Sequence, residues 1–140
     1  MMTETISKAQ QNRADQFAAH EEWVTIGRRS DLIPGSGVGA LAGELQIALF
    51  WLPELYDTLY AVTNYCPFSG VHLIARGIVG DVGGEPVVAS PLYKQHFSLL
   101  DGRCLEDPEQ KLQVFQARFY RDEIQVLQRR ASGKKARAAA

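Results

Sequence analysis

Short apolar runs, each closed by a turn, dominate the chain after residue 22. Trp23-Val24-Thr25-Ile26 is an aromatic and β-branched run that Gly27 closes, which is typical of a strand. Residues 44–49 alternate between polar and apolar positions, as a half-buried strand does, and Pro53 ends the apolar run that follows. Further strands are predicted at residues 59–63, 86–89, 97–99, 112–120 and 123–127, with turns at Asp101-Gly102 and Arg121-Asp122. No amphipathic helix appears in this part of the sequence, so the pattern predicts an all-β sandwich or small barrel.

The two ends of the chain differ from this middle part. Residues 1–22 are mostly polar and offer little to bury, so we expect a helical or disordered arm. Residues 129–140 carry five basic side chains and no acidic one, although the whole chain has a net charge of −1. We expect a solvated, disordered basic tail there, with nucleic-acid binding as an alternative that rests on those five charges alone. The predicted domain therefore covers residues 23–128.

Length and composition exclude several classes of protein. A chain of 140 residues fits one domain. The longest apolar run, residues 47–52, is far shorter than the roughly 20 residues of a membrane helix. The polar start of the chain does not resemble a secretory signal. Two cysteines, Cys66 and Cys104, are too few for a disulfide framework and suit a reducing compartment. The sequence therefore predicts a cytoplasmic protein without a membrane partner.

Two segments join turn residues to an X-Pro step at the end of a predicted strand. They are Asn64-Tyr65-Cys66-Pro67-Phe68-Ser69-Gly70 and Ala89-Ser90-Pro91-Leu92-Tyr93-Lys94-Gln95-His96-Phe97. Together they resemble the two cluster-binding loops of the Rieske iron–sulfur domain, where Cys-x-His and Cys-x-x-His motifs hold a [2Fe–2S] cluster. In such a domain two thiolates bind one iron and two imidazoles bind the other.

This sequence departs from the Rieske pattern at three of the four ligand positions. Cys66 stands at the first Cys position, and the other three positions hold Phe68, Ser90 and Tyr93. Phenylalanine has no lone pair, and hydroxyl groups are poor substitutes for thiolate and imidazole at neutral pH. We therefore expect no metal in this chain. Packing of Phe68 and Tyr93, with hydrogen bonds from Ser90 and the Tyr93 hydroxyl, is expected to join the loops instead.

A rearranged metal site is the alternative that these residues leave open. It would use Cys66, His72, His96 and Cys104. Their spacing matches no compact metal-binding motif, so ordinary surface or partly buried roles are favoured for all four.

A longer set of motifs narrows the resemblance. It includes Arg76-Gly77-Ile78-Val79-Gly80-Asp81, the stretch from Gly84 to Gln95 with its Ser-Pro-Leu-Tyr-Lys-Gln end, and Gly102-x-Cys104-Leu105-Glu106-Asp107. From about Trp23 to Leu127 the chain is similar to the small subunits of bacterial NAD(P)H-dependent nitrite reductase, which have a Rieske-like domain with degenerate loops. The resemblance implies a Rieske-like antiparallel fold and a role in reducing nitrite to ammonium.

In that family the FAD, the sirohaem and the iron–sulfur cluster belong to a separate large subunit. The resemblance thus implies a non-catalytic small subunit that stabilises or orients the large one and carries no cofactor. No Gly-x-Gly-x-x-Gly follows a predicted strand, and no catalytic constellation is apparent, which agrees with that role. Lys94, Gln95 and His96 project from the second loop and are the candidates for contact with the large subunit.

Two other classes of function compete with this one. A Rieske-type electron carrier would need ligands that the sequence lacks. A stand-alone binding or regulatory module remains open, because a fold does not by itself determine a partner.

Overall fold

The computed structural model describes residues 19–54 and 58–131, in which strands account for most of the regular structure. The strands are β1 (Ala19–Arg28), β2 (Gly37–Ala42), β3 (Leu45–Leu52), β4 (Thr58–Thr63), β5 (Ile78–Val82), β6 (Glu85–Ala89), β7 (His96–Ser98), β8 (Val114–Phe115), β9 (Ala117–Tyr120) and β10 (Glu123–Ala131). Two 3-10 turns, η2 (Arg29–Asp31) and η3 (Ile74–Arg76), are the described helices. The prediction of an all-β fold is confirmed. None of the described helices has the length and hydropathy needed to cross a membrane.

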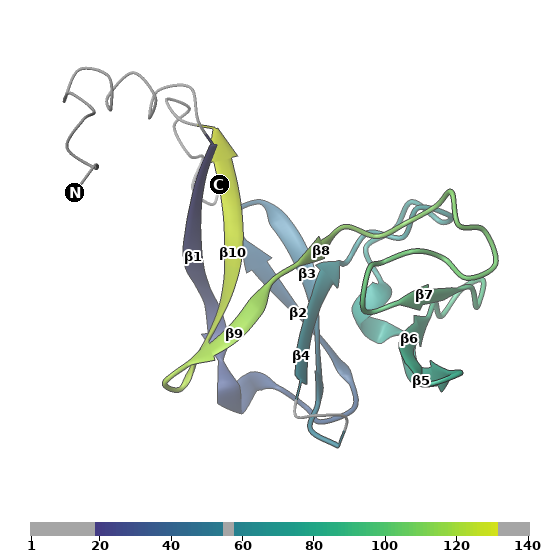
Figure 1. The fold of residues 1–140 in the computed structure, drawn as a ribbon, viewed down its shortest axis with the longest axis horizontal. Coiled ribbons are helices and arrows are strands. Elements are labelled where there is room, and N and C mark those ends of the chain that lie inside the picture. Colours follow the sequence, from purple (N-terminus) through teal and green to yellow (C-terminus); the bar gives the residue numbers. More distant parts are fainter. Residues whose placement is uncertain (1–18, 55–57, 132–140) are drawn as a thin grey trace, which may run out of the picture.

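The strands form three antiparallel sheets. Their orders are β1-β10-β9, β2-β3-β4-β8 and β5-β6-β7. Figure 1 shows the four-stranded sheet between the other two. Because of this position, side chains on both of its faces are covered.

Strand β3 contributes to two hydrophobic cores. Ile47 and Leu49 pack toward β10, whereas Ala48 and Phe50 pack toward the small sheet of β5, β6 and β7. All four are at most 1% exposed. Alternate side chains of a strand point to opposite faces, so a strand covered on both faces is apolar throughout. This explains the apolar run that the sequence shows at residues 47–52.

The first and last strands pair along their whole length. Their register runs from Ala19 opposite Ala131 to Arg28 opposite Glu123, with a bulge between Thr25 and Gly27. Residues 19–22 and 129–131 therefore belong to the sheet, and the predicted boundaries at 23 and 128 were drawn too narrowly. Backbone pairing extends these strands through polar positions that carry no hydrophobic signal. The rest of the predicted arm and tail, residues 1–18 and 132–140, lies outside the described residues.

A charged network ties the small sheet to the turn that follows it. The Arg103 guanidinium donates to both oxygens of Glu85 at 3.0 Å and to Asp101 at 2.9 Å. Ser98 on β7 also donates to Glu85, at 2.5 Å. Hydrogen bonds from Ser98 and then Arg103 hold the pKa of Glu85 below its usual value. This network joins β6 and β7 to residues 101–103 and so stabilises the sheet that carries the second of the two loops, residues 90–95.

Candidate functional site

Asn64 shapes the first of the two loops, residues 64–72, as it leaves β4. Its carbonyl accepts hydrogen bonds from the backbone N–H groups of Leu73 and Ile74, at 2.9 and 3.1 Å. Its side-chain oxygen accepts from the N–H of Ala75 at 2.7 Å. Within the loop, the Cys66 N–H donates to the Val71 carbonyl at 2.9 Å. The backbone carbonyl and the side chain of Asn64, a residue only 9% exposed, together thus fix the loop where it joins η3.

The second loop, residues 90–95, closes on Ser90. The Ser90 N–H donates to the Gln95 carbonyl, and the Lys94 N–H donates to the Ser90 carbonyl, both at 2.9 Å. Lys94 takes a left-handed conformation, with φ of 60°, which costs a non-glycine residue some strain. The turn leaves residues 91–94 exposed.

Cys66 and Ser90 meet where the two loops come together. Their side-chain sulfur and oxygen atoms are 4.0 Å apart, and the residues are 0% and 1% exposed. Burial by itself raises the pKa of the Cys66 thiol, but hydrogen bonds from Ser69, the backbone of Phe68 and Ser90 outweigh it and lower the pKa. The first and second Cys positions of the Rieske pattern are therefore adjacent here, as a thiol beside a hydroxyl.

The two imidazole positions of the pattern have different environments. Phe68 packs on the core, with its ring centroid 6.0 Å from that of Phe97. Tyr93 is 58% exposed. The prediction of a packed aromatic is confirmed for Phe68 and wrong for Tyr93. The reason is the left-handed turn at Lys94, which leaves Tyr93 on the exposed part of the second loop.

The side chains present do not fit a [2Fe–2S] cluster. Of the four ligand positions only Cys66 offers a thiolate; Phe68 offers no donor, and Ser90 and Tyr93 offer hydroxyl groups. Within residues 19–54 and 58–131, no group of three or more His, Cys, Asp and Glu side chains is arranged to hold a metal ion. The rearranged site is not assembled either. The His72 ring makes an edge-to-face contact with Tyr65, with ring centroids 5.3 Å apart, and His96 binds a carboxylate.

That carboxylate belongs to Glu106, which the sequence analysis did not select. It accepts from the backbone N–H of His96 at 2.8 Å and lies 2.7 Å from His96 Nδ1. It also accepts from Cys104 Sγ at 3.5 Å. Burial opposes ionisation of Glu106, but the two hydrogen bonds from His96 lower its pKa, while burial raises the pKa of the Cys104 thiol. The only signal for Glu106 was its place in the Cys-Leu-Glu-Asp turn.

The candidate contact residues Lys94, Gln95 and His96 differ in their exposure and in their hydrogen-bond partners. Lys94 is exposed, whereas His96 is half-buried and engaged with Glu106. Gln95 is half-buried, and its Oε1 has no hydrogen-bond partner among the described residues. The two loops also expose large hydrophobic side chains: Tyr65 (43%) and Val71 (48%) on the first, and Leu92 (53%) and Tyr93 (58%) on the second. These four residues and Lys94 are called the loop-tip surface below.

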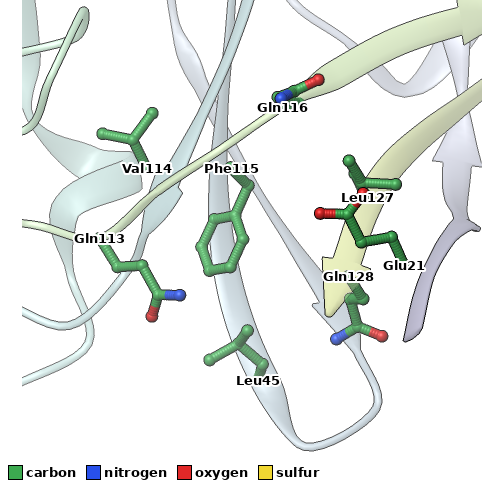
Figure 2. Close-up of a pocket in the computed structure, with 8 residues that line it drawn as sticks. All are labelled: Glu21, Leu45, Gln113, Val114, Phe115, Gln116, Leu127 and Gln128. Carbon is green, nitrogen blue, oxygen red and sulfur yellow. The ribbon is translucent and has the colours of Figure 1, made fainter. Parts of the chain in front are cut away.

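A separate pocket of about 270 Å³ opens between the first sheet and β8 (Figure 2). It is lined by Glu21, Leu45, Gln113, Val114, Phe115, Gln116, Leu127 and Gln128. Glu21 is the only ionisable side chain in this lining, beside three glutamines. A single carboxylate without a nucleophile or a second acid–base group does not make a catalytic site.

Comparison with known proteins gives consistent matches. The family described as the Rieske-like [2Fe-2S] domain matches residues 22–127. The NADH nitrite reductase small subunit of Salmonella typhimurium is 38% identical over 105 residues, which cover 75% of this chain and 96% of the relative. A crystal structure from Mycobacterium tuberculosis, assigned as an NADH-dependent nitrite reductase small subunit, is 44% identical with a TM-score of 0.72. That match covers 78% of this chain and 96% of the other.

A longer relative contains the same domain. The NAD(P)H nitrite reductase large subunit of Klebsiella oxytoca is 42% identical over 97 residues, which cover 69% of this chain but 10% of that protein. In that organism a domain similar to this chain is thus part of a large-subunit polypeptide.

Proposed function

This chain belongs to the family of Rieske-like [2Fe-2S] domains, and from its similarity to whole small subunits of one enzyme we propose that it is the small subunit of an NAD(P)H-dependent nitrite reductase. It is thus part of an oxidoreductase that reduces nitrite to ammonium. The relatives named small subunits match along nearly their whole length, so the similarity covers the complete subunit and not one shared motif.

The partner is the large subunit of that enzyme, and the Klebsiella oxytoca protein supports this assignment most directly. The same domain can be a separate chain in some organisms and part of a longer chain in another. In the longer chain, the covalent link keeps the domain at a high effective concentration next to its partner, whereas a separate chain depends on a non-covalent contact. The separate chain then has to bind its partner through its own surface.

The role of this chain is to stabilise or orient the large subunit. In this proposal FAD, sirohaem and an iron–sulfur cluster belong to the large subunit, as the family resemblance implies. The donor set at Cys66, Phe68, Ser90 and Tyr93 does not suit a [2Fe–2S] cluster in this chain. The two cysteines are free thiols, which suits a cytoplasmic location.

The loop-tip surface is the part of the chain that we assign to contact with the large subunit. It groups exposed apolar side chains beside Lys94 on loops that are held by internal hydrogen bonds. Ordered loops that expose apolar groups lose little entropy on binding, which favours an interface. Gln95 and His96 follow Lys94 along the chain; the Gln95 carbonyl accepts from the Ser90 N–H, and His96 is bound to Glu106.

The test is co-purification of the tagged full chain with its large subunit, with iron and acid-labile sulfide measured on the free small subunit. We expect a stable complex that reduces nitrite and a free small subunit without stoichiometric iron. Two iron and two sulfide per chain would instead favour a Rieske-type electron carrier. Absence of any complex with the large subunit would favour a stand-alone module.

A further inference from the structure

Strand β5 forms an open edge of the small sheet. Within residues 19–54 and 58–131, it pairs with β6 on one side and with no strand on the other (Figure 1). The exposed fractions of Ile78 and Val82 on this strand are 76% and 47%. Asp81 is its only charged residue. Edge strands in soluble proteins are commonly protected by several charges or by a covering segment, and this one has little of either.

The register shows which backbone groups face the open side. Asp81 lies opposite Pro86, which has no N–H, and the carbonyl of Pro86 accepts from Leu99 on the far side of β6. Opposite residues in an antiparallel pair alternate between bonded and non-bonded pairs. Asp81 and Val79 are therefore in the non-bonded positions, and their N–H and C=O groups point away from β6.

A groove of about 370 Å³ runs along the same edge. Its walls are Pro34, Gly35, Leu52, Pro53, Glu54, Val79, Gly80 and Asp81. The two outward-facing residues of β5 thus belong to the groove as well. The only ionisable groups in this lining are the acidic side chains Glu54 and Asp81, and neither forms a salt bridge within the described part of the chain. The groove is therefore mainly apolar, and its lining includes two carboxylates.

We propose that an extended segment of the large subunit adds to β5 as a further strand, with apolar side chains in this groove and a Lys or Arg facing Glu54 and Asp81. The open backbone groups select an extended chain, the wall of Pro34, Leu52 and Val79 selects apolar side chains, and the two carboxylates select a basic residue. This proposal rests on the large subunit being the partner. It assigns a second contact, apart from the loop-tip surface.

Two substitutions test the contact in the full-length complex. Glu54→Lys reverses a charge in the groove lining, opposite the expected basic residue, and we expect the Kd for the large subunit to rise roughly tenfold. Glu44→Lys is the matched control, because Glu44 is also an exposed carboxylate but lies outside the groove. It should leave the Kd unchanged. Both side chains are exposed, so neither change should affect folding.

Hydrogen exchange gives a readout that does not depend on a variant. In the complex we expect the amides of Val79 and Asp81 to become protected relative to the free small subunit, since each gains a hydrogen-bond partner. If the wild-type chain binds the large subunit but these two amides exchange as before and Glu54→Lys binds normally, the β5 proposal is wrong and the partner assignment stands. If the wild-type chain does not bind the large subunit, both proposals fail. If these amides become protected from exchange in the isolated chain as its concentration rises, β5 pairs with a second copy of this chain. That result would overturn the proposal.

Discussion

The ring of Phe68 packs on the ring of Phe97, with centroids 6.0 Å apart and planes inclined at 50°. Phe97 is fully buried in β7, so this contact joins the first loop to the small sheet. It connects two segments that a metal centre joins in a Rieske domain. The loops here are thus held by an apolar contact, by the Cys66–Ser90 pair and by the carboxylate of Glu106.

Replacing Phe68 with Ala should destabilise the domain by about 1–3 kcal/mol, because a half-buried aromatic loses part of its packing. Tyr93→Ala is the matched control at the other imidazole position. With its side chain mainly in solvent, it should change the free energy of unfolding by less than about 0.5 kcal/mol. Urea unfolding followed by fluorescence measures both. Equal losses in the two variants would contradict the assigned packing.

Gly102→Ala should cost at least about 2 kcal/mol, since two separate effects oppose it. The residue has a φ of +86°, and an added Cβ would lie 2.0 Å from the Leu112 carbonyl oxygen. Gly80→Ala is the control: no atom lies within 4 Å of its added Cβ. Thermal unfolding of the two variants should show a much lower midpoint for the first only.

Arg103→Gln should lower the urea midpoint, because Glu85 and Asp101 both lose a charged donor. Arg76→Gln removes the same charge from an exposed position on η3 and should leave the midpoint close to that of the wild type. A midpoint that falls equally in both would mean that net charge, and not the network, is responsible.

Acid should weaken the domain, and Arg103 should set part of that dependence. Folding lowers the pKa of Glu85 through Ser98 and Arg103, and that of Asp101 chiefly through the Arg103 N–H. A carboxyl group whose pKa is lower in the folded state stabilises it above the unfolded pKa of about 4, and this stabilisation is lost as the pH falls through the folded pKa. Unfolding free energies measured between pH 6 and 3, a range of about three units around those values, should therefore fall. The fall should be shallower in Arg103→Gln, and parallel curves would count against the network.

Leu92→Asp should weaken binding of the large subunit if the loop-tip surface is a contact, because it places a charge in an apolar interface. We expect a rise in Kd of about tenfold. Leu41→Asp introduces the same charge at a similarly exposed position elsewhere and should bind normally. Calorimetric titration of the wild type and both variants distinguishes the two results.

The sequence predicted the strands whose apolar residues alternate or cluster. It did not predict strands that are defined mainly by backbone pairing with a neighbouring strand. Residues 45–52 and 58–63 agree closely with the expected strands. Strand β5 was not predicted, because Gly80 and Asp81 interrupt its apolar pattern and backbone pairing with β6 defines it. Proximity of the two loops followed from the family resemblance. The exposure of Tyr93 did not, since it depends on the conformation of Lys94.

The pairing of Ala19 with Ala131 has a consequence for how this domain attaches to other chains. Both ends of the described fold leave the same end of one sheet, so neither strand has to cross the molecule to reach a neighbour. Such a domain can be fused to either end of a longer polypeptide, or inserted into one of its surface loops, without a change in the connections between the domain's own strands. Such a fusion requires new linkers but no new hydrophobic core. This agrees with the Klebsiella oxytoca relative, in which a similar domain makes up 10% of the polypeptide.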